Sequence, residues 1–164
     1  MCGEGVAERM WLGFLAIDKA AQLIAQNDPK LGVPAPDMLL RHLNSKGAPP
    51  AWLTEVKTLY TTAMNEMYRA NTRAREGSRT LTLYYAKKLE FAFHFASCLE
   101  NLYKAHETRA ESLDAAVESL YNALNSLADA ARDSSDRGAI ALLNERMEVV
   151  NVDNGTDYRR RTLE

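Results

Sequence analysis

The sequence predicts an all-α fold, a mainly antiparallel bundle of four long helices with one or two short accessory helices. Apolar residues recur at intervals of three and four over several long stretches, which is the period of an amphipathic helix. β-branched residues nowhere alternate with polar residues over a useful length, so strand signals are nearly absent. The connections between the long stretches are short, and short connections favour antiparallel neighbours.

Length and composition restrict the class of protein. The 164 residues suit one domain with a sizeable core, and 46% hydrophobic with 26% charged content is ordinary for a soluble globular chain. The net charge of −2 creates no general field that recruits nucleic acid or anionic membranes. No apolar run approaches the ~18–20 residues of a membrane span. We therefore expect neither a membrane nor a nucleic-acid partner.

The chain is expected to form a single helical bundle domain over residues 1–150, followed by a polar, flexible tail over 151–164. The first residues lack the basic and apolar pattern of a secretory signal. The two cysteines, Cys2 and Cys98, indicate no disulfide framework. Both observations favour a cytoplasmic location.

The first helix is expected over about residues 6–26. Its apolar face recurs by four and three, at Met10, Phe14, Ile17, Ala21 and Ile24. The sequence Asn27-Asp28-Pro29 ends it, since proline disfavours helical geometry in the residue before it. After a loop rich in glycine and proline, a short helix is expected over about 37–43.

The third helix is expected from Pro50, which suits a first helical turn, to about Arg75. Gly77 is the expected C-terminal stop of this helix. Ser78 or Thr80 is then expected to cap the helix that follows.

Two more helices are expected towards the end of the chain. Ser112 is the expected cap of the fifth helix, whose apolar face is narrow enough to resemble a bundle seam. The polar residues 133–136 end it and precede a last helix over about 137–150.

The fourth helix, over about 81–106, is predicted to be the centre of the bundle. It carries two adjoining apolar stripes, whereas a helix at the edge of a domain needs only one. Cys98 lies on one of these stripes and is expected to be a small buried hydrophobe. The polar stripe of this helix contains Lys87, Glu90, His94, Ser97, Asn101 and Lys104.

The candidate ligand-binding residues are Glu66, Arg69, Glu90 and His94, on the third and fourth helices. Pockets between bundle helices commonly hold ligands, so a site between these two helices is one hypothesis. The alternative is a solvated surface, since Glu90 and His94 share a polar stripe. The sequence contains no Glu-x-x-His pair and no zinc-ligand spacing. We therefore expect no metal and no cofactor.

A basic segment offers candidate anion-binding residues at Arg73, Arg75 and Arg79. Arginine donates bidentate hydrogen bonds to phosphate and carboxylate groups. The alternative is that these cations compensate the dipole at a helix end.

The leading functional hypothesis is a non-enzymatic packing or interaction domain, such as an adaptor, an accessory domain or a homo-oligomer, because no catalytic constellation is visible. The second hypothesis is a small-molecule or anion-binding bundle. A third hypothesis comes from residues 131–138 followed by 140–145. This segment resembles helical segments that follow the catalytic domain in large bacterial carbohydrate-active proteins, which implies an accessory domain. It covers a small part of the chain and contains no catalytic residue.

Overall fold

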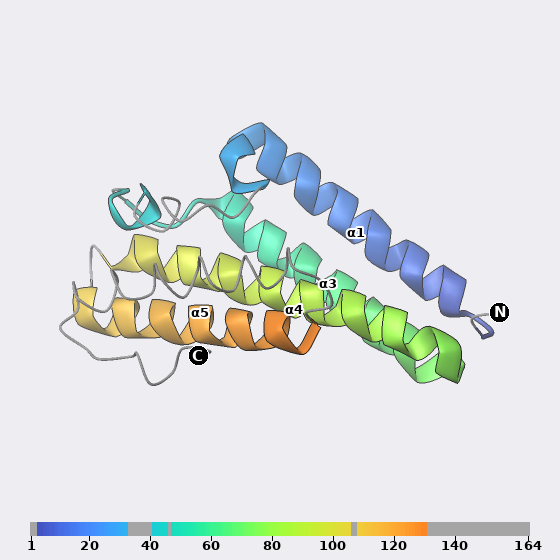
Figure 1. Ribbon diagram of the computed structural model, residues 1–164. Helices are drawn as coiled ribbons and strands as arrows, with labels where there is room; N and C mark the ends of the chain where they lie inside the picture. The colour runs from blue at the N-terminus through green and yellow to red at the C-terminus, as the bar shows by residue number, and fades with distance from the viewer. Residues whose placement is uncertain (1–2, 33–40, 46, 106–107, 131–164) are drawn as a thin grey trace.

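The computed structural model describes residues 3–32, 41–45, 47–105 and 108–130. Its elements are α1 (Val6–Asn27), the 3-10 turn η1 (Pro29–Gly32), α3 (Ala51–Arg73), α4 (Glu76–Lys104) and α5 (Arg109–Ala130). The long helices alternate in direction along the chain (Figure 1). The described residues contain no strand. The predicted all-α class with four long helices is therefore confirmed.

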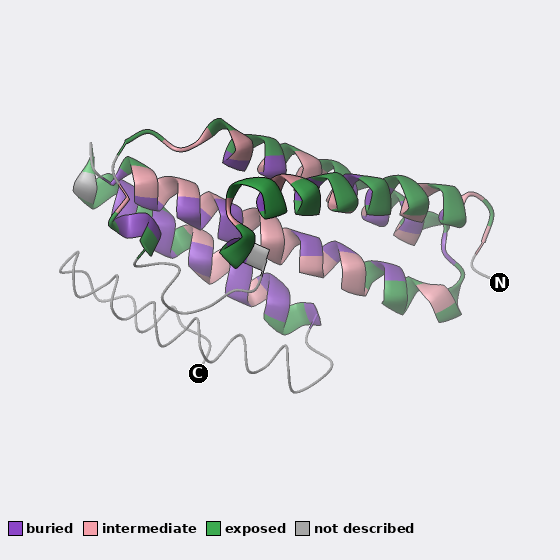
Figure 2. Ribbon diagram, turned by 90° about the horizontal axis from the view of Figure 1, so that it is seen from above, coloured by how far each residue is buried: buried purple, intermediate pink, exposed green. Residues whose placement is uncertain are grey.

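The long helices pack mainly on their neighbours in the chain: α1 on α3, α3 on α4, and α4 on α5. Towards the end that carries η1, α1 diverges from α4 (Figure 1). Figure 2 shows buried residues where the helices face one another and exposed residues along the outer face of α1. The result is an open array, in which α1 covers α3 and leaves part of α4 accessible.

The core has one large and two smaller clusters of buried side chains. The large cluster joins α4 to α5 through Leu99, Leu102, Leu120 and Leu124, among others. A smaller cluster joins α1, α3 and α4 around Met67. The centre of the fold is thus built from leucine contacts on α4, as the two apolar stripes of this helix predict.

A glycine sets the distance between α1 and α3. A Cβ atom at Gly13 would lie 2.8 Å from Cε of Met67 and 3.4 Å from the carbonyl oxygen of Ala63. Because Gly13 has no side chain, the backbone of α1 approaches α3 closely at this point.

Cys98 is buried, as the sequence predicts, at 2% exposure. Burial raises the pKa of its thiol to about 12. The neutral thiol is a poor nucleophile, since thiolate is the reactive form. Cys98 is therefore a packing residue in this fold.

The boundary between α3 and α4 differs from the prediction. Ala74 and Arg75 are extended, with ψ angles of 140° and 157°, so α3 ends at Arg73 and α4 begins at Glu76. Gly77 lies in the first turn of α4 and is not the stop of α3; Ser78 and Thr80 are inside α4 and do not cap it. Burial of Ala74 explains the break, because its methyl group packs in a small cluster with α1.

The start of α5 also differs from the prediction. The helix begins at Arg109, and the backbone N–H of Ser112 donates to the carbonyl of Thr108 over 2.9 Å. Ser112 is therefore inside the first turn, where its hydroxyl lies 2.8 Å from that of Thr108. The expected helix over 137–150 and the expected tail over 151–164 lie outside the described residues, as does most of the short helix expected over 37–43.

Among the helices described, none combines the length and the apolar character needed to span a bilayer.

Candidate functional site

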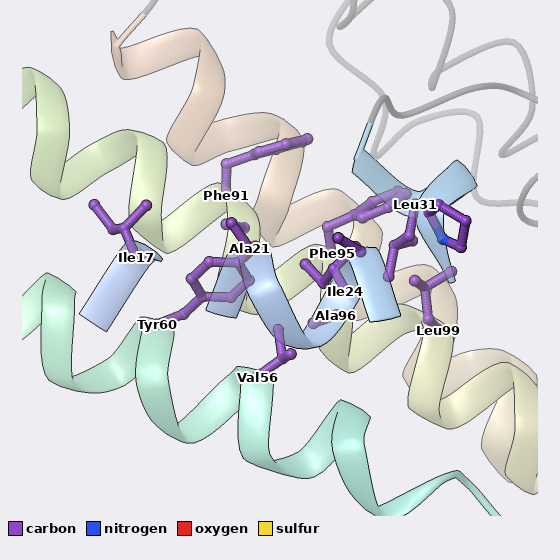
Figure 3. Close-up of a pocket in the computed structure, with 13 residues that line it drawn as sticks. Ile17, Ala21, Ile24, Leu31, Val56, Tyr60, Phe91, Phe95, Ala96 and Leu99 are labelled. Carbon is purple, nitrogen blue, oxygen red and sulfur yellow. The ribbon is translucent and has the colours of Figure 1, made fainter. Parts of the chain in front are cut away.

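An apolar cavity of about 390 Å³ lies between α1, α3 and α4, with η1 at one end (Figure 3). Its walls are formed by side chains of all four elements. They include Ile17, Ala21 and Ile24 of α1, Leu31 of η1, Val56 and Tyr60 of α3, and Phe91, Phe95, Ala96 and Leu99 of α4.

Helical periodicity explains two of these walls. Ile17, Ala21 and Ile24 recur by four and three, so they share the face of α1 that points towards the cavity (Figure 3). Phe91 and Phe95 are one turn apart on α4, and their rings stack with centroids 5.7 Å apart. The cavity lies where α1 diverges from α4 (Figure 1), and the exposed Ala21 marks its mouth, the side that is open to solvent.

Tyr60 is the only polar side chain among the described residues that line the cavity. It is half-buried and packs against both the large core cluster and the cluster around Met67. Burial raises the pKa of its hydroxyl above the ordinary value. The hydroxyl is therefore neutral at pH 7 and able both to donate and to accept a hydrogen bond.

Glu66 lies between α1 and α3, away from the cavity wall. Its carboxylate accepts hydrogen bonds from Arg9 of α1 over 3.0 Å and from Arg69 over 2.7 Å. Burial acts to raise the pKa of Glu66, but the hydrogen bonds and charges of the two arginines outweigh it, and the net pKa is lowered. Glu66 and Arg69 thus form an ion-pair group that joins two helices.

Glu90 belongs to a second polar group, between α3, α4 and α5. It accepts hydrogen bonds from the hydroxyl of Tyr68 on α3 and from Lys87 over 2.9 Å, and the hydroxyl of Ser126 on α5, which donates to the carbonyl of Asn122, also helps to lower its pKa. Lys87 also lies 3.5 Å from a carboxylate oxygen of Asp129. Burial acts to raise the pKa of Glu90, but these hydrogen bonds lower it on balance. The group connects three helices through one carboxylate.

His94 lies one turn after Glu90 and is half-buried. Burial lowers the pKa of its imidazole, and the charge of Glu90 opposes this effect. Of the four predicted ligand-binding residues, the structure therefore places Glu66 with Arg69 and Glu90 near His94, in two groups with different partners. None of the four lines the cavity, and a role for them in binding stays a prediction.

The three candidate anion-binding arginines lie around the connection between α3 and α4. Nε of Arg79 donates to the carbonyl of Ala74 over 3.0 Å, so this guanidinium satisfies a carbonyl at the helix break. Arg73 borders a shallow depression together with Glu4 and Glu8. These carboxylates offset the positive charge there. Arg75 is the residue before α4. Anion binding by the arginines stays a prediction.

The environment of His42 could not be predicted from the amino-acid pattern. This side chain is 3% exposed, and its Nε2 lies 3.6 Å from Oδ2 of Asp28 at the end of α1. Neither ring nitrogen has a hydrogen-bond partner in the structure. Burial, followed by the charge of Arg41, lowers the pKa of His42 to about 4. Tyr60 was also missed as a polar group, although its spacing from Val56 places both residues on one face of α3.

Comparisons with protein-family models, with curated proteins and with solved structures were made for the whole chain. None gives a match. A function for this chain must therefore be argued from its own geometry.

The described residues contain no group of three or more histidine, cysteine, aspartate or glutamate side chains placed to hold a metal ion. Residues 131–145, which carry the resemblance to accessory segments of carbohydrate-active proteins, lie outside the described part of the chain. The accessory-domain hypothesis therefore stays a prediction.

Proposed function

We propose that this protein is a binding domain that holds an apolar small molecule in the cavity between α1, α3 and α4. The observation that carries the proposal is the cavity itself, which has a volume of about 390 Å³. Every described residue that lines it is apolar except for Tyr60. Cavities of ~300–1,000 Å³ with mainly apolar walls and few polar groups are typical of ligand sites.

The energetic argument is that an apolar ligand would remove exposed aromatic and aliphatic surface from water. Ala21, at the mouth of the cavity, is exposed, and Phe91 is only partly buried. Burial of each methylene group in such a site contributes about 0.8 kcal/mol. The walls come from helices that already pack on one another, so binding requires little ordering of the chain.

The test is a thermal unfolding series with n-butylbenzene and the full chain. We expect the ligand to raise the Tm, because a ligand at 100 times its Kd stabilises the folded state by about 2.7 kcal/mol. The variant Ala21→Trp fills the mouth of the cavity and should lose this shift. The control Ala115→Trp places the same side chain at an exposed position of α5 and should keep it. A wild-type Tm that does not respond at saturation would reject the proposal.

A second candidate is the interaction role, with a second copy of this chain as the partner. The supporting observation is a group of exposed apolar side chains on one face of α1: Trp11 is 63% exposed, Leu15 40% and Phe14 37%. The ring of Phe14 packs on that of Tyr85 on α4, with the ring centroids 5.3 Å apart. The exposed Leu81 lies one turn before Tyr85. Exposed apolar groups that gather in this way are typical of interaction surfaces.

Light scattering over a range of concentrations tests this second candidate. A wild-type dimer that becomes a monomer in the variant Leu81→Ser would support it. Leu83→Ser is the matched control, because Leu83 is 41% exposed but lies two residues further along α4 and so on a different face. A wild-type monomer at all concentrations would exclude self-association as the function.

A further inference from the structure

We infer that the ligand of this cavity is a neutral molecule with an apolar body and one polar oxygen, and that the Tyr60 hydroxyl holds that oxygen. The inference rests on the proposed function, since it assigns the chemical class of the molecule that binds there. Alcohols and ketones of suitable size belong to this class. Fatty carboxylates do not.

The size of the ligand follows from the volume of the cavity. A cavity of about 390 Å³ lies near the lower end of the ~300–1,000 Å³ that is typical of small-molecule sites. A chain of ten carbons with one oxygen, or an alkylbenzene of similar size, suits a site of this size.

The walls offer no cation to a charged head group. No lysine, arginine or histidine is among the described residues that line the cavity. On α4 the cation nearest in sequence to Phe91 is Lys88, and its ammonium group lies over the ring of Tyr84, 5.6 Å from the centroid. A carboxylate bound among these walls would lose its water without gaining a cation, which is strongly unfavourable.

A single polar atom, by contrast, has a partner. Tyr60 projects from α3 towards α1, beside Ala21 (Figure 3). Its hydroxyl is the one side-chain group of the wall that can hydrogen-bond a ligand oxygen. Because a polar atom that is buried without a partner is unfavourable, an oxygen of the ligand should bind next to Tyr60 and the apolar body should contact the α4 wall.

The experiment is isothermal titration calorimetry of the full chain at pH 7.5 with 1-decanol, decanoate and n-butylbenzene. The wild-type protein should bind 1-decanol at least about tenfold more tightly than decanoate. Tyr60→Phe should weaken the binding of 1-decanol by about three- to tenfold. It should change the affinity for n-butylbenzene by less than about twofold, because that molecule has no oxygen. Circular dichroism and the Tm of Tyr60→Phe establish that the variant is folded.

Three results overturn the inference. If n-butylbenzene binds but Tyr60→Phe leaves 1-decanol unchanged, the hydroxyl does not hold the ligand oxygen. If decanoate binds as tightly as 1-decanol, and Lys88→Gln removes this binding, then Lys88 is a head-group site and the ligand class is wrong. If none of the three molecules binds the wild-type protein, the proposed function itself fails, and the inference fails with it.

Discussion

The imidazole of His42 and the carboxylate of Asp28 approach to 3.6 Å, between Nε2 and Oδ2, at the point where α1 ends. The distance is too long for a hydrogen bond. Arg41 binds the same aspartate over 2.9 Å, and the ring of Tyr103 on α4 lies 5.2 Å from the imidazole. His42 is thus a neutral buried side chain held beside two charged groups.

This arrangement predicts a loss of stability on mild acidification. The folded-state pKa of His42 is about 4, below the ordinary 6.5, so between these pH values the unfolded chain binds a proton that the folded chain does not. The free energy of unfolding should therefore fall as the pH falls through this window, by at most about 2 kcal/mol between pH 7.5 and pH 5. Urea unfolding at the two pH values measures it.

The variant His42→Leu should remove most of that pH dependence. His94→Gln is the control. Because His94 also has a lowered pKa, its contribution to the pH dependence must be measured separately from that of His42. If His42→Leu keeps the full wild-type dependence, the histidine is not the titrating group.

The ion pair between Arg9 and Glu66 joins α1 to α3, so its removal should lower the stability of the protein. Glu66→Gln keeps the shape of the side chain but removes the charge that Arg9 and Arg69 share. We expect a loss of about 1 kcal/mol in the free energy of unfolding. Hydrogen bonds to charged groups contribute about 1.5–3 kcal/mol, but Arg69 is exposed and Arg9 is partly exposed, so solvent weakens both ion pairs. Denaturant unfolding measures it. Glu55→Gln on the exposed face of α3 should change stability by less than about 0.5 kcal/mol.

The surroundings of two glycines, one on α1 and one on α4, predict different responses to replacement by alanine. Gly77→Ala meets open space, so the higher helix propensity of alanine should stabilise the protein by up to about 1 kcal/mol. Gly13→Ala brings a methyl group to 2.8 Å from Cε of Met67, and the required shift should offset that gain. We expect Gly13→Ala to be less stable than Gly77→Ala by about 1 kcal/mol, as measured by thermal unfolding. Equal stabilisation of both variants would mean that α1 does not approach α3 as closely as described.

The burial of Cys98 predicts that its thiol reacts slowly with labelling reagents in the folded protein. Its thiol is buried and its pKa is raised to about 12, so thiolate is rare at pH 8. In a Cys2→Ser background, labelling with a disulfide reagent should be at least about a hundredfold slower in buffer than in denaturant, because the label reaches Cys98 only when the fold opens. Labelling at the rate of the unfolded chain would contradict the burial of this residue.

Much of the fold was predictable because helical periodicity is a local property. The spacing of apolar residues indicated four long helices and the central position of α4, and α4 does pack on both α3 and α5. The helix boundaries were less predictable. Ala74, at the break, is buried in a cluster with Val6 of α1, and a contact with another helix gives no local signal at Gly77 of where α3 ends.

The candidate site was less predictable than the fold. Glu66 and Glu90 were candidates because pockets between bundle helices commonly hold ligands, yet each carboxylate has its own set of partners within the protein. The cavity is formed instead by apolar residues, whose spacing looks the same in a filled core. Only the space left between diverging helices distinguishes the two cases.

The amino-acid sequence by itself determined the helical class of this protein, the faces of its long helices and the packing role of Cys98, because each depends on residues within a few turns of one another. The tertiary structure alone decided which faces meet. It joined Arg9 to Glu66, placed His42 beside Asp28, and opened a cavity around Tyr60. Periodicity states which residues share a face, but how closely α1 approaches α3 at Gly13 and how far it diverges from α4 (Figure 1) are set by contacts between helices. These distances determine whether the facing side chains fill the space.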